Sequence, residues 1–208
     1  MTIPLDVPAL SGELVRLEPL SSTHEGALLA AACEDRTSYD YTWVPRDGRE
    51  VEDYLSYHLG ERTTGGHFPI VITRRGDGRV VGHTALFNLR FMPGRDAPFA
   101  AEIGHTWLAG SAQRSGVNVN TKFLLCEHAF ETWGVERVDF KTDARNARSR
   151  AAIQALGAQF EGVLRSFSRS WAPGEAGQTR DSAIFSILST EWPEVKSTLV
   201  ERVRASKG

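Results

Sequence analysis

The chain has 208 residues, of which 41% are hydrophobic and 24% are charged, a composition typical of a globular protein with a substantial hydrophobic core. Lysine and arginine total 24 against 26 aspartates and glutamates, so the formal net charge is only −2. This balance provides no overall attraction for nucleic acid or for an anionic membrane, and we expect neither as a partner.

The longest purely apolar run, residues 27–33, is far shorter than the roughly 20 residues that cross a bilayer. The first ten residues lack the basic start and apolar core of a signal peptide. Cys33 and Cys126 are too few for a disulfide framework and lack metal-ligand spacing. We therefore expect a cytoplasmic protein with one domain over residues 1–208 and no metal.

Hydrophobic periodicity predicts the elements of the first half in chain order. They are a strand, two helices, a hairpin through Gly76-Asp77-Gly78 and a further strand, at residues 12–20, 24–34, 49–62, 67–91 and 99–108. The middle of the chain is therefore expected to form an antiparallel meander.

In the second half, apolar residues recur at helical spacing and predict one helix that ends at Gly134, namely Val119, Phe123, Cys126, Phe130 and Trp133. A strand, a short helix, two strands and a final helix with Pro193 in its first turn follow, at 135–143, 147–156, 159–171, 180–188 and from Glu191. The order strand–helix–strand from 99 to 143 predicts a parallel crossover within a mixed α/β sheet.

The stretch "AQRSGVNVNTK", residues 112–122, lies at the start of the long helix. Unpaired N–H groups at a helix start bind anions, and Gly116 permits a positive φ or a close backbone approach. Asn118 also tolerates unusual backbone angles, and Arg114, Ser115 and Thr121 offer side-chain donors. Simple capping accounts for the same residues equally well, and the stretch matches neither a Walker loop nor the dinucleotide fingerprint.

The chain resembles the GNAT superfamily of acyl-CoA-dependent N-acetyltransferases over nearly its whole length. The segments that carry the resemblance are "EIGHTWL", "AQRSGVN" and "DARNARSRAAIQALGAQFEGVLR". It is most similar to the branch of ribosomal-protein N-terminal acetyltransferases and their small-molecule relatives. The resemblance implies a mixed, mostly antiparallel sheet flanked by helices, with one splayed pair of parallel strands, and acetyl-CoA as the co-substrate.

In this family a Gln/Arg-x-x-Gly-x-Gly/Ala turn binds the pyrophosphate of coenzyme A. Gln113 and Gly116 match the first and fourth positions, whereas Asn118 replaces the last small residue. The resemblance also implies that Asn146 bonds the pantetheine arm and that the Ser149 hydroxyl helps to protonate the departing thiolate. The cofactor residues expected in this way are Leu108, Gln113, Arg114, Ser115, Gly116, Val117, Asn118, Val119, Asn146 and Ser149.

Glu102 is the candidate general base because it lies in an otherwise apolar strand, where burial favours the neutral form of a carboxyl group. His105 is a reserve candidate on the substrate side of the site. Strict alternation places Glu102 and His105 on opposite faces, so the two line one site only if a bulge of the kind that GNAT proteins carry intervenes. A salt-bridged Glu102 and a packed core His105 remain the structural alternatives. Cys126, on the apolar helix stripe, is expected in the core rather than in catalysis.

Tyr41 and Trp43, in "YDYTWVP", are candidates for an aromatic wall of the acceptor pocket, with Asp40 attracting a cationic amine. The alternative is that Trp43 merely covers the core.

We therefore expect an N-acetyltransferase that acts on the primary amine of a protein N-terminus or of a small molecule. Two alternatives remain open, a regulatory module that binds an acyl-CoA without turnover and a transferase that uses another donor such as succinyl-CoA. The C-terminal hairpin and helix also leave a homodimer open.

Overall fold

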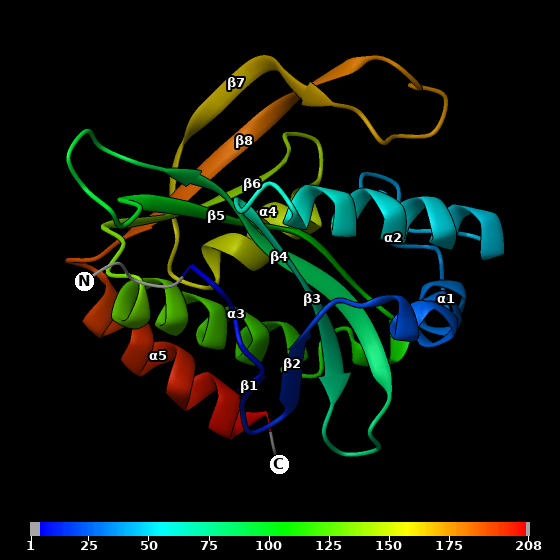
Figure 1. The fold of residues 1–208 in the computed structure, drawn as a ribbon, viewed down its shortest axis with the longest axis horizontal. Coiled ribbons are helices and arrows are strands. Elements are labelled where there is room, and N and C mark those ends of the chain that lie inside the picture. The colour runs from blue at the N-terminus through cyan, green and yellow to red at the C-terminus, as the bar shows by residue number, and fades with distance from the viewer. Residues whose placement is uncertain (1–4, 207–208) are drawn as a thin grey trace.

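The computed structural model describes residues 5–206, which form one eight-stranded sheet with the strand order β1-β2-β3-β4-β5-β6-β8-β7 (Figure 1). The strands are β1 (Leu10–Ser11), β2 (Val15–Pro19), β3 (His67–Arg74), β4 (Val80–Arg90), β5 (Ala100–Leu108), β6 (Arg137–Asp143), β7 (Gln159–Arg169) and β8 (Thr179–Leu188). The hairpin of β3 and β4 and the strands β5, β6 and β8 confirm the sequence prediction.

Among the described residues, five α-helices flank the sheet, namely α1 (Glu25–Cys33), α2 (Gly48–Arg62), α3 (Val117–Glu127), α4 (Ala147–Gln154) and α5 (Trp192–Ala205). Tyr54 of α2 bonds His83 of β4, while Lys122 of α3 bonds the adjacent Thr84. Because neighbouring strand residues point to opposite faces, α2 and α3 cover opposite faces of the sheet. No helix within residues 5–206 is long and apolar enough to cross a membrane.

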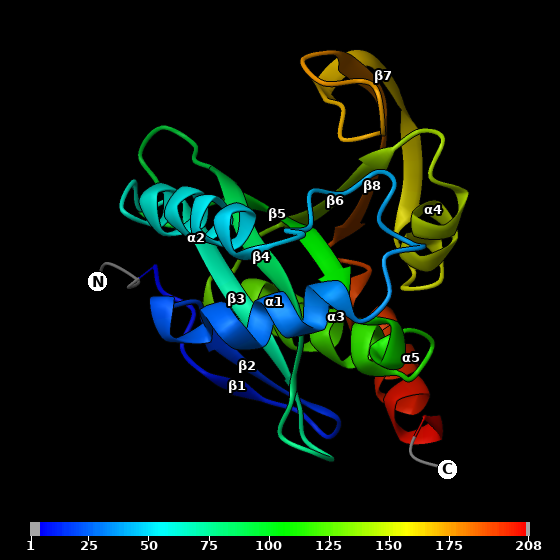
Figure 2. The ribbon, with the colours of Figure 1, turned by 90° about the vertical axis from the view of Figure 1, so that its right-hand side faces the viewer.

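All neighbouring strands run antiparallel except β5 and β6, which are parallel and so confirm the predicted crossover. These two strands pair only from Ala100 to Glu102, against Arg137 to Asp139. β6 stays paired with β8 as far as Asp143, so β5 leaves its neighbour directly after Glu102. The sheet therefore opens between β5 and β6. In the view of Figure 2, α2 and α4 lie on either side of this region.

The core contains most of the predicted apolar positions, although Val119 and Phe123 of the helix stripe are only partly buried. Val138 and Phe140 of β6 are almost fully buried, as are Leu125 and Cys126 of α3 and the Trp133 side chain behind it. Cys126 is thus a core residue, as predicted. β7 is the exception, because nearly every residue of this edge strand is exposed, and Figure 1 shows the β7–β8 hairpin rising above the remaining elements.

Two predicted elements differ from the structure. The strand expected over 12–20 forms only as β2, from Val15 to Pro19, and residues 12–14 instead make the turn from the additional strand β1. The Asn120 side chain accepts the N–H groups of Leu14 (2.8 Å) and Val15 (3.2 Å) at this turn. The single helix expected as far as Gly134 ends as α-helix at Glu127 and continues as a π-helix over His128–Thr132.

Candidate functional site

The turn before α3 leaves a row of backbone donors free. Arg114 and Gly116 have positive φ angles of 57° and 79°, which reverse the chain into the helix. Within residues 5–206, none of the six N–H groups from 114 to 119 donates a hydrogen bond to the protein. Asn118 has no positive φ, so the conformational reason considered for it does not apply. The turn provides six consecutive donors at a helix N-terminus, which suits a phosphate group.

The Gln113 side chain fastens this turn to neighbouring segments. Its amide nitrogen donates to Ser38 Oγ (2.8 Å) and to the Leu108 carbonyl (3.0 Å), and its oxygen accepts from Arg148 (3.3 Å). The Leu108 carbonyl also accepts from the Tyr39 hydroxyl at 2.9 Å. Gln113 therefore connects the end of β5 to the start of α4, and Ser115 closes the turn by donating to the Ala112 carbonyl at 2.6 Å.

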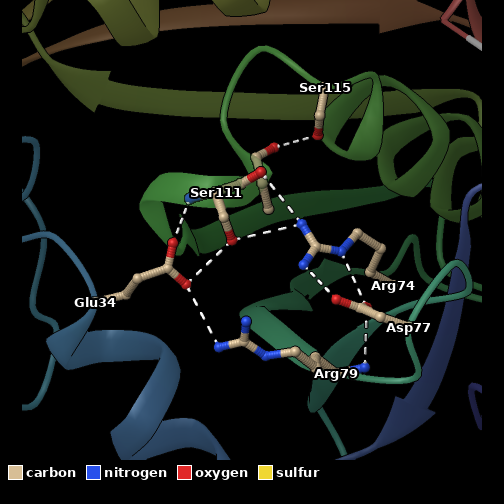
Figure 3. Close-up of polar contacts among 7 residues, drawn as sticks. Glu34, Arg74, Asp77, Arg79, Ser111 and Ser115 are labelled. Atoms are coloured by element: carbon tan, nitrogen blue, oxygen red, sulfur yellow. Dashed lines mark hydrogen bonds and ion pairs between the residues drawn. The ribbon is translucent and has the colours of Figure 1, made fainter.

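A polar network on the surface holds the segment just before the turn (Figure 3). The Ser111 N–H donates to Glu34 Oε1 at 2.6 Å, and Arg74 donates to the Ser111 carbonyl at 3.2 Å. Asp77 in turn fixes Arg74 with a contact of 2.5 Å. The end of α1 and the β3–β4 turn thereby clamp the approach to α3.

Packing against Ser206 and Leu14 also constrains Gly116. A Cβ atom at this position would lie 2.4 Å from Ser206 Cβ and 2.8 Å from Leu14 Cδ1. Glycine is therefore required both by the backbone angle and by the close approach of the C-terminal residues.

The start of α4 presents the two residues expected at the pantetheine arm. The Asn146 oxygen accepts the Ser149 N–H at 3.0 Å, which is a capping bond. Within the described part of the chain, the Asn146 amide nitrogen and the Ser149 hydroxyl have no hydrogen-bond partner, and both residues are half-buried. Capping thus occupies only one polar atom of Asn146, and two donors remain free beside the turn.

A β-bulge brings Glu102 and His105 to the same face. Ala85 pairs with Gly104 and His83 with Trp107, so β5 has one extra residue here, and His105 has a φ of 51°. The Phe87 ring lies 4.7 Å from the His105 ring. A Cβ atom on Gly104 would meet both Phe87 (2.9 Å) and Glu102 Oε1 (3.7 Å). The bulge that Glu102 and His105 need in order to line one site is therefore present.

Glu102 is buried and already has two partners. Asn88 donates to its Oε2 at 3.0 Å, and Lys141 Nζ lies 3.3 Å from its Oε1. The salt-bridged arrangement is thus what the structure contains, at the point where β5 and β6 separate.

Four histidines gather around the bulge, on α2, β3, β4 and β5: His58, His67, His83 and His105. His58 and His67 share a hydrogen bond of 2.9 Å, and Tyr54 bonds His83 at 2.7 Å. Burial lowers the pKa of His105 to about 3 and that of His67 to about 4, and it also lowers the pKa values of the other two. All four are therefore neutral near pH 7. Within residues 5–206, no group of three His, Cys, Asp or Glu residues is arranged to hold a metal ion.

Sequence reasoning singled out only His105 of these four. His58, His67 and His83 lie on three different elements, and no regular spacing in the sequence connects them. His83 carried a usable signal, because it is an ionisable residue within the otherwise uncharged and largely buried run "VVGHTALF".

The two aromatic candidates contact different elements. Trp43 stacks on Trp171 with ring centres 5.2 Å apart and also stacks on His58, which links it to the histidine group. Tyr41 instead lies under the Arg145 guanidinium, 5.4 Å away, next to α4. Asp40 is exposed.

Lys122 reaches the bulge from the opposite face. It is fully buried, and its Nζ atom contacts the hydroxyls of Thr106 (2.5 Å) and Thr84 (3.2 Å) without an ion pair in the described residues. Burial lowers the Lys122 pKa to about 7. Sequence reasoning missed this residue because its helix position resembles that of a surface lysine.

Comparison with known proteins agrees with this fold. The model of the GNAT acetyltransferase domain matches residues 15–159. A GCN5-related N-acetyltransferase from Brucella melitensis is 25% identical with a TM-score of 0.82, covering 94% of this chain and 85% of its own. A protein from T. thermophilus assigned as an acetyltransferase is 35% identical with a TM-score of 0.77, covering 93% and 96%.

Mycobacterium smegmatis RimJ, in complex with CoA-disulfide, shares the fold at 22% identity and a TM-score of 0.71, covering 90% and 88%. None of the curated proteins compared with this chain matches it at significant similarity. The match over well more than half of the sequence shows that the chain belongs to the GNAT acetyltransferase family.

Proposed function

We propose that this protein transfers an acetyl group from acetyl-CoA to the primary amine of a small molecule or of a protein N-terminus, by direct attack in a ternary complex. Acetyl transfer in general follows from the family, whereas the donor-binding residues and the acceptor are our inference. The observation that carries the proposal is the row of six free N–H groups at 114–119, joined through Gln113 to the start of α4.

These residues fit coenzyme A, which when acetylated supplies the acetyl group as a thioester. The N–H groups of Arg114 to Val119 bind the pyrophosphate at the positive end of the α3 dipole. The free amide nitrogen of Asn146 bonds the pantetheine arm. The Ser149 hydroxyl, which has no partner in the described residues, hydrogen-bonds the departing thiolate and relays to it the proton that the attacking nitrogen loses.

On the acceptor side, Glu102 is proposed to accept the amine proton, and His105 lies beside it as a neutral imidazole. A neutral amine then attacks the thioester directly, so no nucleophilic side chain of the protein is required. Cys126 is consistent with this, because burial raises the pKa of its thiol to about 12 and keeps it protonated. Tyr41 and Trp43 remain proposed wall residues of the acceptor pocket.

The test measures coenzyme A binding by calorimetry and thiol release from acetyl-CoA and succinyl-CoA over a panel of amines. We expect binding together with thiol release that depends on an amine. The variant Ser149→Ala should lower kcat and leave coenzyme A affinity unchanged, because the backbone donors at 114–119 remain.

Absence of coenzyme A binding would refute the proposal. Binding without release for any amine would instead indicate the regulatory module, and faster release from succinyl-CoA would change the assigned donor.

A further inference from the structure

Arg180 lies on β8 next to the acceptor side of the site, and the function proposed above does not use it. Lys141 and Asp143 of β6 pair with Ile184 and Ser182 of β8, so alternation places Arg180 on the face that carries Lys141 and Glu102. Phe185 and its alternate neighbours face the core instead. Arg180 thus stands beyond the end of β6, where the sheet has opened.

The Arg180 guanidinium is half-buried and has no partner among the described residues. Its Nε atom is buried without a hydrogen-bond partner, and Arg180 forms no ion pair within residues 5–206. Burial lowers the pKa of Arg180, while Asp143 and Glu102 lie close enough to oppose this effect. A partly desolvated guanidinium without a partner is costly, and a bound carboxylate relieves that cost through two parallel hydrogen bonds.

The neighbouring charges are already paired with one another. Lys141 lies 3.3 Å from Glu102, and Arg145 bonds Asp143 at 2.8 Å and Glu175 at 2.7 Å. Asp143 also accepts the Arg145 N–H at 2.9 Å, so both of its oxygens are occupied. The three carboxylates balance the three cations in number, but Arg180 is left as the cation of this group that forms no ion pair within residues 5–206.

The four histidines are neutral near pH 7, so they add no charge to the ion pairs around Arg180. Burial is the main cause that lowers the His105 pKa to about 3, and the positive charges of Lys141 and Arg180 lower it further. The charge of Arg180 therefore affects His105 directly, and both residues lie beside the proposed site of amine attack. A simple alkylammonium finds no unpaired buried anion among these described residues, whereas an acceptor that brings its own negative charge finds a cation.

We infer that Arg180 is a specificity-determining residue that binds a carboxylate carried by the acceptor close to its amine. This inference rests on the proposed function and narrows its acceptor to amino carboxylates. The carboxylate belongs either to a free amino acid or to an acidic residue at a peptide N-terminus, and both place an anion a few bonds from the nucleophile.

The experiment compares kcat/KM for acceptors that differ only in the carboxylate. L-phenylalanine is paired with 2-phenylethylamine, and an Asp-Ala-Ala peptide amide is paired with its Asn-Ala-Ala counterpart. We expect the wild-type enzyme to prefer the carboxylate in at least one pair by roughly 10- to 100-fold, the range for a hydrogen bond between charged groups. The pair that shows the preference identifies the source of the carboxylate.

The variant Arg180→Gln should remove this preference by raising KM for the carboxylate acceptor, while its rate with the matched acceptor that lacks the carboxylate stays unchanged. Arg180→Lys keeps the charge without the planar fork and should retain part of the preference. Arg165→Gln, an exposed arginine on neighbouring β7, is the matched control and should behave as wild type. Coenzyme A affinity checks that each variant is folded.

Equal kcat/KM within both pairs for the wild-type enzyme would overturn the inference and leave the acetyltransferase intact. A preference that survives in Arg180→Gln would also overturn it. Thiol release with no acceptor at all would overturn the proposed function and this inference together.

Discussion

Replacing Gly116 by alanine tests whether packing against the chain end shapes the phosphate-binding turn. The new Cβ atom would lie 2.4 Å from Ser206 Cβ, 2.6 Å from Ser206 Oγ and 2.8 Å from Leu14 Cδ1. The backbone at Gly116 also has a φ of 79°, which an alanine adopts only at a cost. Two separate penalties therefore fall on one substitution.

The variant Gly94→Ala separates the penalty of the backbone angle from the penalty of the packing clash. Gly94 has the same φ of 79°, yet a Cβ atom there meets nothing within 4 Å. A left-handed backbone costs an alanine about 1–2 kcal/mol, so this is the expected destabilisation of Gly94→Ala. Overpacking adds about 1–3 kcal/mol, so Gly116→Ala should lose about 2–5 kcal/mol in all.

Urea unfolding measures both variants, and calorimetry measures their affinity for coenzyme A. We expect Gly116→Ala to be the less stable one and to bind coenzyme A more weakly, because the displaced turn no longer presents its N–H groups together. Adding Ser206→Gly removes the two shortest contacts and should restore part of both properties. Equal destabilisation of the two alanine variants, or no recovery in the double variant, would refute the packing argument.

Three further predictions concern Glu102 on β5, Asn118 at the start of α3, and Lys122, which lies against the opposite face of β5 from Glu102. Glu102→Gln should lower kcat by about 10²–10⁴-fold and leave coenzyme A affinity unchanged. The kcat of this variant should rise again at higher pH, because the free amine then loses its proton without a base. An unaltered kcat would remove Glu102 as the base. Asn118→Gly keeps the backbone N–H, so coenzyme A affinity should stay the same by calorimetry, and a clear loss would assign phosphate binding to the side chain. Burial lowers the Lys122 pKa to about 7 in the folded protein, against an ordinary value of 10.5. Between these two pKa values the unfolded chain therefore binds one more proton at Lys122 than the folded protein, so the free energy of unfolding rises with pH in this range. Urea unfolding at pH 7.5 and 9.5 should show the wild type gaining on Lys122→Met by about 1.4 kcal/mol per pH unit, and parallel pH profiles would contradict this.

Local patterns were enough to predict most of the elements. The alternation around Val138 and Phe140 has one periodicity, and burial of one face follows directly. The helix stripe was only partly right, because Cys126, Phe130 and Trp133 are buried whereas Val119 and Phe123 are only partly buried. The parallel crossover followed from element order and chain connectivity. Predictions were less accurate where a distant side chain intervened, as Asn120 does between β1 and β2.

The candidate site was only partly readable. The turn at Gln113 to Asn118 and the residues of "NARS" carry local motifs, which made them candidates before any contact was known. The bulge at His105 has no local signal, because it depends on how β5 pairs with β4. The ion pair of Glu102 with Lys141 likewise joins residues 39 positions apart.

By itself, the sequence determined the elements, their order and the positive-φ glycine at the helix start, since these depend on residues close in the chain and on backbone sterics. Only the tertiary structure decided which side chains share a site and which charges remain unpaired. It joined Glu102 to Lys141, gathered four histidines into a neutral group and left Arg180 without a partner in the described chain. Burial and ion pairing depend on contacts between distant segments, and these exist only once the sheet has formed.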